Sequence, residues 1–226
     1  ENYPPHPLAA SLSKHASIRF DQEDNYSFCS NPFDFIYKSD LFSKGNMSKQ
    51  LVDDFFQVIN NKSLNVRGQS LLNNGKQSSG NIFLLNDEPV QKIKKIIIDE
   101  LENYKKKFSE KKQGIIDNWP QNYKIIGWLI IMEKGGNLSA HMHKEGWVSG
   151  SIYLERPKRV DEFDGDLLFS FHGSNYPKDD KEFDSKLLQI EKGNMVLFPS
   201  SLFHGTFPYS SDEKRITLAF DIMPVY

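Results

Sequence analysis

Four residues in the C-terminal half of the chain could together bind a metal ion and a carboxylate: His141, His143, His204 and Arg215. The sequence has six histidines, and three of them belong to this set. Neutral imidazole is a common ligand of first-row transition metals such as iron. A buried arginine can hold a carboxylate through two parallel hydrogen bonds. The residue types therefore predict a metal centre with a carboxylate-binding side chain nearby.

The spacing of the three histidines fits a single ion. Residues two apart on a strand point to the same side, so His141 and His143 can reach one ion. They share a face with the odd residues of Trp147–Leu154 if that strand extends back to them. His204 must come from an adjacent strand across the barrel. An isolated His-x-His pair is more often a polar surface patch, but His204 and Arg215 downstream favour a site.

A second set of metal ligands also fits the sequence. His143 and Glu145 form a His-x-Glu pair, and in that register His141 lies outside the ligand set. Two histidines and a carboxylate are the more usual ligands of non-haem Fe(II) oxygenases. Our prediction is the register with His141, His143 and His204, in which three ligands on one side leave positions open for O2 and a chelating cosubstrate.

The carboxylate-binding residues are predicted from strand alternation. In the strand-like run Arg215–Asp221, Thr217 shares a face with Arg215 and the apolar residues lie on the other face. A guanidinium and a hydroxyl can hold a buried carboxylate in a fixed geometry. We expect Tyr153 and Ser149, on the polar face of another strand, to complete this clamp. A metal and a carboxylate clamp in one barrel are what an Fe(II)- and 2-oxoglutarate-dependent dioxygenase requires.

The elements that must position these residues change type along the chain. Apolar residues recur at helical spacing in 51–59, behind Ser48, and in 90–108, behind Asp87 and Pro89. After residue 120 the pattern becomes β-rich, in the runs Tyr123–Glu133, Trp147–Leu154, Asp166–Phe171, Met195–Phe198 and Arg215–Asp221. Polar residues on one face of such strands indicate a barrel with a ligand cavity. The sequence thus predicts an α+β fold, a double-stranded β-helix (the jelly-roll or cupin-like barrel) buttressed by N-terminal helices.

The division of the chain follows from the same patterns. Residues 1–30 contain three prolines and many polar residues, so we expect an irregular N-terminal arm. Residues 31–226 are long enough for one oxygenase domain with a substantial core. Within it, 31–120 is the expected helical support region and 121–226 the β-barrel core. A chain that begins at Glu1 rather than Met indicates an excised domain or a processed protein.

Composition limits the partners of the protein. The net charge of −2 provides no overall field that would attract nucleic acid or an anionic membrane. No apolar run approaches the length of a membrane span, and no signal-peptide pattern opens the chain. The single cysteine, Cys29, excludes an intramolecular disulfide and suits a reducing compartment, so we expect a cytoplasmic location. Nothing in the sequence specifies an oligomeric state.

The run Trp128–Glu155 resembles bacterial 2OG-Fe(II) oxygenases that are often found with tetratricopeptide repeats. That family has a tryptophan strand, a His-x-His, a Ser-Gly-x-x-Tyr strand, a late histidine and an Arg-x-Ser/Thr. The segment GKQSSGNIF, Gly75–Phe83, also resembles the family's Gln-Thr/Ser-x-Gly-x-Leu-Phe segment. The resemblance implies a double-stranded β-helix, an Fe(II) centre with His141 and His204 as ligands, and 2-oxoglutarate as cosubstrate. His143 stands where most members of the wider superfamily have Asp or Glu.

We therefore predict a dioxygenase that uses O2 to hydroxylate an unidentified substrate and releases succinate and CO2. One alternative is a three-histidine, cupin-type metal dioxygenase that does not use 2-oxoglutarate; it would have no need of a carboxylate clamp at Arg215. The other is a non-catalytic jelly-roll binding module with a structural metal. A structural metal has a closed ligand set, so an open coordination position would favour chemistry.

The substrate itself cannot be read from these patterns. A polar segment with Arg67, Gln69, Lys76 and Gln77 could cover the mouth of the barrel, and Trp147 and His172 could line its entrance. Each of these residues is more often an ordinary surface or core residue.

Overall fold

The structure, a computed structural model, describes residues 5–225. Its four α-helices are α1 (Pro7–Arg19), α2 (Lys49–Asn61), α3 (Glu88–Phe108) and α4 (Gly114–Asp117). The two helices predicted from the sequence are therefore present as α2 and α3. Ser48 caps α2 by accepting a hydrogen bond from the Leu51 N–H, as its position predicts. Single 3-10 turns lie at Pro32–Phe35, Ile82–Leu84 and Ser109–Lys111.

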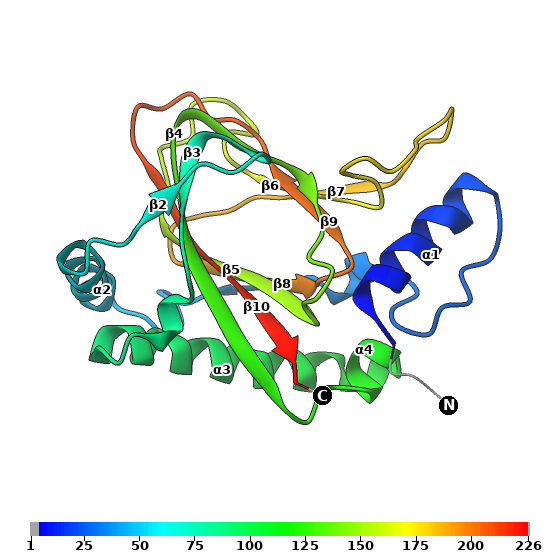
Figure 1. Cartoon of the computed structure of the whole chain (residues 1–226), viewed down its shortest axis with the longest axis horizontal. Helices are drawn as coiled ribbons and strands as arrows, with labels where there is room; N and C mark the ends of the chain where they lie inside the picture. Colours follow the sequence, from blue (N-terminus) through cyan, green and yellow to red (C-terminus); the bar gives the residue numbers. More distant parts are fainter. Residues whose placement is uncertain (1–4, 226) are drawn as a thin grey trace.

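Ten strands form one strongly curled antiparallel sheet (Figure 1). They are β1 (Tyr37–Asp40), β2 (Val66–Arg67), β3 (Leu72–Ser78), β4 (Tyr123–His141), β5 (Val148–Glu155), β6 (Leu167–Ser170), β7 (Ser185–Leu188), β8 (Asn194–Pro199), β9 (Phe203–Thr206) and β10 (Arg215–Pro224). The order of the main path is β1-β8-β5-β10-β4-β9-β6-β7, and β3 joins β4 to β2. Consecutive strands of the chain are thus often separated in the sheet, as in a jelly roll.

The long strand β4 belongs to both halves of the curled sheet. Residues 123–132 pair with β10, whereas Leu138 and His141 pair with β9. Between these segments Gly135 has a φ of +74°, which other residues rarely adopt. A Cβ at Gly136 would lie 2.7 Å from the Glu133 carbonyl oxygen. The two glycines therefore let β4 bend from one half of the sheet into the other and carry His141 to β9.

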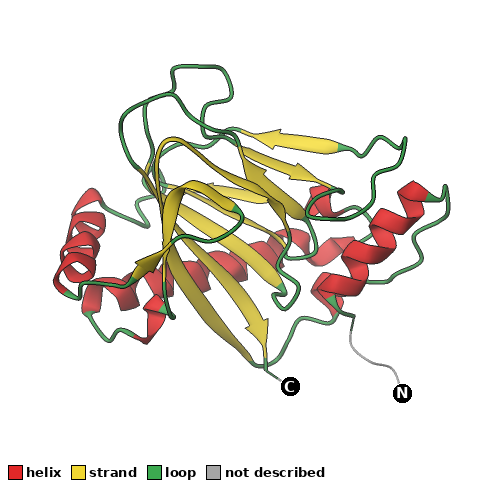
Figure 2. Cartoon of the chain, turned by 45° about the horizontal axis from the view of Figure 1, so that its top comes forward, coloured by secondary structure: helices red, strands yellow, loops and turns green. Residues whose placement is uncertain are grey.

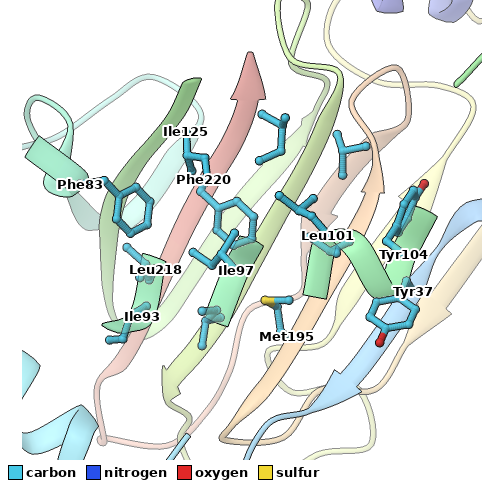
Figure 3. Close-up of a cluster of buried hydrophobic side chains, with 14 of the residues drawn as sticks. Tyr37, Phe83, Ile93, Ile97, Leu101, Tyr104, Ile125, Met195, Leu218 and Phe220 are labelled. Carbon is cyan, nitrogen blue, oxygen red and sulfur yellow. The ribbon is translucent and has the colours of Figure 1, made fainter. Parts of the chain in front are cut away.

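Helix α3 packs against the outer face of the larger half of the sheet. Ile93, Ile97 and Leu101 of α3 are fully buried and lie over Leu218 and Phe220 of β10 (Figure 3). Even-numbered residues of β10 point to this core, so its odd-numbered residues point to the opposite side. Figure 2 shows the helices outside the curled strands. The odd-numbered residues of β10, from Arg215 to Asp221, line a cavity on the inner side.

Two expectations about the N-terminal half of the chain need correction. The predicted irregular arm contains the helix α1, because Pro7 occupies a first-turn position that needs no N–H donor and His6 caps it by accepting from the Leu8 N–H. Residues 1–4 of the predicted arm lie outside the described residues. The segment 31–120 is not only helical, since it also supplies β1, β2 and β3 to the sheet.

The predicted strands of the C-terminal half are present as β4, β5, β6, β8 and β10, and β9 is the adjacent strand expected to carry His204. The bounds of β9 and the presence of β7 were not predicted. Both β7 and β9 have only four residues, too few for a clear alternation. No helix within residues 5–225 is long and apolar enough to cross a membrane.

Candidate metal centre and cosubstrate cavity

His141 and His204 face each other on neighbouring strands. His141 ends β4, and His204 lies directly opposite it on β9, with 4.4 Å between the ring centroids. Opposite residues of an antiparallel pair project from the same face of a sheet. The His143 ring lies 5.1 Å from that of His141 and 5.0 Å from that of His204. Each of the three side chains offers one ligand atom, and these atoms lie within 4.8 Å of one another.

His143 does not lie on a strand, contrary to the expectation that Trp147–Leu154 extends back through both histidines. β4 ends at His141, and His143 lies in the loop before β5. Two backbone hydrogen bonds hold this loop: the His143 N–H donates to the Ser200 carbonyl (3.1 Å), and the Gly146 N–H donates to the His143 carbonyl (3.3 Å). The convergence of His141 and His143 therefore comes from a turn of the loop and not from strand periodicity.

All three imidazoles present the same ring nitrogen to the centre of the group. Each Nδ1 faces an oxygen: Ser139 carbonyl for His141 (2.9 Å), Leu202 carbonyl for His204 (3.3 Å) and Asp221 Oδ1 for His143 (2.6 Å). Carbonyl and carboxylate oxygens accept hydrogen bonds, so each Nδ1 carries the hydrogen and each Nε2 is left as the ligand atom. The Nε2 atoms of His141 and His143 are 3.1 Å apart.

This donor set fits a metal ion. Two imidazole nitrogens at ~2.1 Å from one ion and at a right angle would be ~3.0 Å apart, close to the observed separation of the His141 and His143 atoms. Burial, reinforced by the neighbouring His143, lowers the pKa of His141 to about 4. Burial and the other two histidines also lower the pKa of His204 well below its usual value. Neutral imidazole is the form that binds metal, so the fold holds both side chains ready for an ion.

A cavity of about 430 Å³ extends from the three histidines into the curled sheet. The metal-binding group lies along one part of its wall, and Arg215, Thr217 and Tyr153 lie along another. Glu145, the alternative ligand, is exposed at the cavity and is not part of the group of converging ligand atoms. The geometry therefore favours the register with His141 over the His-x-Glu register.

Arg215 is buried beside this cavity without a partner for much of its guanidinium group. Its side chain is only 2% exposed, and its Nε and Nη1 have no hydrogen-bond partner within residues 5–225. The guanidinium carbon lies 5.2 Å from the centre of the Tyr153 ring. Burial lowers the pKa of Arg215, because a desolvated cation lacks compensation. A buried cation with unused donors is suited to an anionic ligand.

Of the other predicted clamp residues, Thr217 and Tyr153 lie on the part of the cavity wall that carries Arg215, whereas Ser149 does not. Thr217 follows Arg215 on the same face of β10, is paired with Tyr153 of β5, and lines the cavity. Ser149, in contrast, lies opposite Asp221, four residues farther along β10 than Thr217. Its hydroxyl donates to Asp221 Oδ1 (2.6 Å) and shares a hydrogen bond with Ser200 Oγ (2.8 Å). Ser149 is therefore beside the metal-binding group and not beside Arg215.

The residues named for the mouth of the barrel separate into two groups. Gln69 and Gln77 line the cavity, whereas Arg67, Lys76, Trp147 and His172 do not. Trp147 is a core residue whose Nε1–H donates to the Ile115 carbonyl. Its burial could not be seen from the sequence, because a tryptophan at the start of a strand has the same pattern in a core and at an entrance.

One residue of the site was missed altogether: Asp221, the acceptor of the His143 hydrogen bond. The sequence did contain a signal for it. Asp221 has the same strand parity as Arg215 and Thr217, and it is the acidic residue of that polar face. Strand parity alone did not pair Asp221 with His143, because only the folded structure brings the end of β10 beside the loop that carries His143.

Comparison with known proteins identifies the domain. Residues 127–221 match the sequence profile of the family described as "Putative 2OG-Fe(II) oxygenase". The matched segment contains all three histidines and Arg215. This segment therefore matches the 2OG-Fe(II) oxygenase family, as the resemblance in the sequence predicts. A comparison of its sequence with curated proteins finds no match.

Solved structures of other proteins have the same fold as this chain. A prolyl-4-hydroxylase from Pseudomonas putida is 12% identical, with a TM-score of 0.55 over 84% of this chain and 93% of that chain. HygX from Streptomyces hygroscopicus, with nickel and 2-oxoglutarate bound, is 12% identical, with a TM-score of 0.57 over 86% and 85%. The non-heme alpha ketoglutarate dependent epimerase SnoN from nogalamycin biosynthesis is 10% identical, with a TM-score of 0.58 over 96% and 81%.

The solved structures confirm the predicted α+β double-stranded β-helix. The family match of residues 127–221 supports the predicted enzyme class. The family match of residues 127–221 indicates an enzyme that uses Fe(II), 2-oxoglutarate and O2 to act on a substrate. The histidine group and the buried arginine are the parts of the described structure that suit the metal and the cosubstrate.

Proposed function

We propose that His141, His143 and His204 bind the Fe(II) ion of this oxygenase, and that Arg215, with Thr217 and Tyr153, holds the distal carboxylate of 2-oxoglutarate. The observation that carries the proposal is that two complementary sites share one cavity. One is a set of imidazole nitrogens that converge, and the other is a buried guanidinium with unused donors. We further propose that the reaction is a hydroxylation.

Fe(II) and 2-oxoglutarate, once bound, supply the oxidation: O2 gives one oxygen atom to succinate and one to the hydroxylated product, with loss of CO2. The protein residues prepare this chemistry. The Nδ1 contacts with Ser139, Leu202 and Asp221 fix the three imidazoles in orientation. Arg215 neutralises and aligns the distal carboxylate, so the rest of the cosubstrate points toward the histidines. Apolar residues such as Ile130, Leu138 and Phe198 line the same cavity, where they would limit the access of bulk water to the cosubstrate.

The proposal is tested by measuring succinate from 2-oxoglutarate with Fe(II), in the presence of candidate amino acids, peptides and small metabolites. The parent protein should produce succinate, and a true substrate should increase its rate. His204→Ala and Arg215→Ala should each reduce this production. Parent-like succinate production in either variant would contradict its assigned role.

Two alternatives differ from the proposal in their need for Arg215. A cupin-type three-histidine dioxygenase without 2-oxoglutarate would leave the buried Arg215 guanidinium uncompensated, which is costly. A binding module with a structural metal would be expected to close the coordination shell, but no fourth side chain joins the three histidines among the described residues.

A cytoplasmic location stays a proposal, supported by the single, buried and unpaired Cys29.

A further inference from the structure

The ligand set of this oxygenase lacks a carboxylate, but a carboxylate lies directly behind one of its imidazoles. Asp221 Oδ1 is 2.6 Å from His143 Nδ1, on the side of the ring away from the other histidines. The same oxygen accepts a hydrogen bond from the Ser149 hydroxyl at 2.6 Å. We propose that Asp221 is a positioning residue of the metal centre, which orients His143 and restores, through a hydrogen bond, the negative charge absent from the ligand set.

The need for such a residue follows from where the three histidines lie. His141 and His204 are on paired strands, and each Nδ1 faces a backbone carbonyl two residues earlier in its own segment. Their rings are therefore oriented by the local backbone. His143 lies in a loop and has no such carbonyl contact; its Nδ1 instead reaches the side chain of Asp221 on β10. A distant strand thus fixes the ring that the loop alone would leave free to rotate.

Asp221 is itself held in place. Its strand position is paired with Ser149 of β5 and Ile126 of β4. Ser149 also shares a hydrogen bond with Ser200, whose carbonyl accepts from the His143 N–H. The backbone and the ring of His143 are therefore tied to one network, and Asp221 is its acidic member. The side chains of Asp221 and His143 are only 14% and 15% exposed, which limits competition from water.

The charge of Asp221 should matter as well as its geometry. A carboxylate that accepts the Nδ1–H of a ligating imidazole makes the opposite nitrogen a stronger donor to the metal. In the more usual two-histidine, one-carboxylate site the negative charge is on a ligand. Here the carboxylate is one side chain farther out, and its influence is transmitted through His143. The inference rests on the proposed metal centre, since it requires His143 to be a ligand.

Metal titration of four proteins separates orientation from charge: the parent, Asp221→Asn, Asp221→Ala and the control Asp212→Asn. Asn keeps an oxygen that can accept from Nδ1 and removes only the charge, whereas Ala removes both. With Ni(II) and Fe(II) under anaerobic conditions, we expect Asp221→Asn to weaken binding ~10-fold and Asp221→Ala up to ~100-fold. Asp212 is at the surface, where its side chain is 89% exposed, and its variant should bind like the parent. Parent-like binding by Asp221→Ala would overturn the inference.

A second background shows whether Asp221 acts through His143. In His143→Asp, the side chain of residue 143 has no N–H to donate to Asp221, and two carboxylates would share the space. Asp221→Asn should then have no weakening effect on metal affinity, or should strengthen it. An equal loss in both backgrounds would show a general structural role and would contradict the inference. The absorption bands of the Co(II)-substituted protein should also shift in Asp221→Asn and remain unchanged in Asp212→Asn.

These results can be distinguished from a failure of the proposed function. If His141→Ala and His204→Ala bind metal with the same affinity as the parent, the metal centre is elsewhere and both proposals fail. If those variants lose metal while the Asp221 variants bind like the parent, the metal centre stands and the positioning role alone is wrong.

Discussion

Arg215 and Asp221 lie on the same face of β10 and contact the same cavity at different ends. Asp221 accepts a hydrogen bond from His143, whereas the guanidinium of Arg215 is buried near Tyr153. At ~3.4 Å per residue, their Cα atoms are separated by about 20 Å of strand. One rigid strand therefore sets the spacing between the proposed metal centre and the proposed carboxylate site.

Loss of a strand-borne histidine should remove the metal site. His141→Ala and His204→Ala each take away one of three converging ligands, so we expect stoichiometric Fe(II) binding to be abolished in both. Anaerobic titration with Fe(II), followed by measurement of bound iron, tests this. His172→Ala is the matched control, because His172 lies outside the cavity and should be dispensable for iron. Retention of one equivalent of iron by both variants would place the site elsewhere.

Removal of the buried guanidinium should affect the cosubstrate and leave the metal in place. Arg215→Ala should weaken 2-oxoglutarate binding more than 10-fold, since loss of a buried bidentate charge pair costs at least ~2 kcal/mol. Fe(II) binding should be unchanged, because Arg215 does not contact the histidine group. Calorimetric titration of the metal-loaded protein with 2-oxoglutarate measures the effect, and Arg67→Ala, at an exposed position, is the control. An unaltered titration would favour the cupin-type alternative.

Conversion of the middle ligand to a carboxylate should be tolerated. His143→Asp supplies the oxygen ligand found in most non-haem Fe(II) oxygenases, so we expect it to keep Fe(II) binding and to retain or raise uncoupled turnover of 2-oxoglutarate. Succinate production without added substrate is the measurement. A folded variant unable to bind iron would show that the loop is shaped for imidazole. An inactive parent beside an active variant would instead indicate that the natural site serves binding.

The strand-borne part of the site could be predicted from the sequence, because alternation states which side chains share a face. The shared face of Arg215 and Thr217 on β10, and the place of Tyr153 on the polar face of β5, follow from that rule. His143 and Ser149 show its limit. Whether two residues of one face are neighbours in space depends on where a strand ends and on its register with the next, and a single sequence specifies neither. The chain turns after His141, so strand alternation does not determine the direction in which the His143 side chain points.

A buried histidine far from the metal centre should make the protein sensitive to acid. His15 of α1 is stacked on Phe183, with 4.8 Å between the ring centroids, and its Nε2 has no partner within residues 5–225. Burial, followed by the nearby His172, lowers its pKa below the ordinary value of 6.5. Below that pH the unfolded chain takes up a proton more readily than the folded protein, so this contribution to stability is present above about pH 6.5 and is lost as the pH falls further.

The His15 effect can be isolated by thermal unfolding of the metal-free protein at about pH 7.5 and about pH 5. His15→Phe removes the titrating group and retains an aromatic ring, so its Tm should fall less between these conditions than that of the parent. His6→Asn is the control, because His6 is exposed and Asn also caps helices well. An equal decrease of Tm in the parent and in His15→Phe would show that His15 does not contribute.

The proposed site requires that Fe(II) binds to His141, His143 and His204 while Arg215 holds 2-oxoglutarate. Crystals grown without oxygen in the presence of both compounds, with diffraction recorded at the iron absorption edge, test it most directly. We predict one anomalous peak bounded by the three Nε2 atoms, with the distal carboxylate of 2-oxoglutarate bound to the guanidinium of Arg215. A peak with Glu145 as a ligand and His143 turned away, or a cosubstrate that does not contact Arg215, would contradict the account.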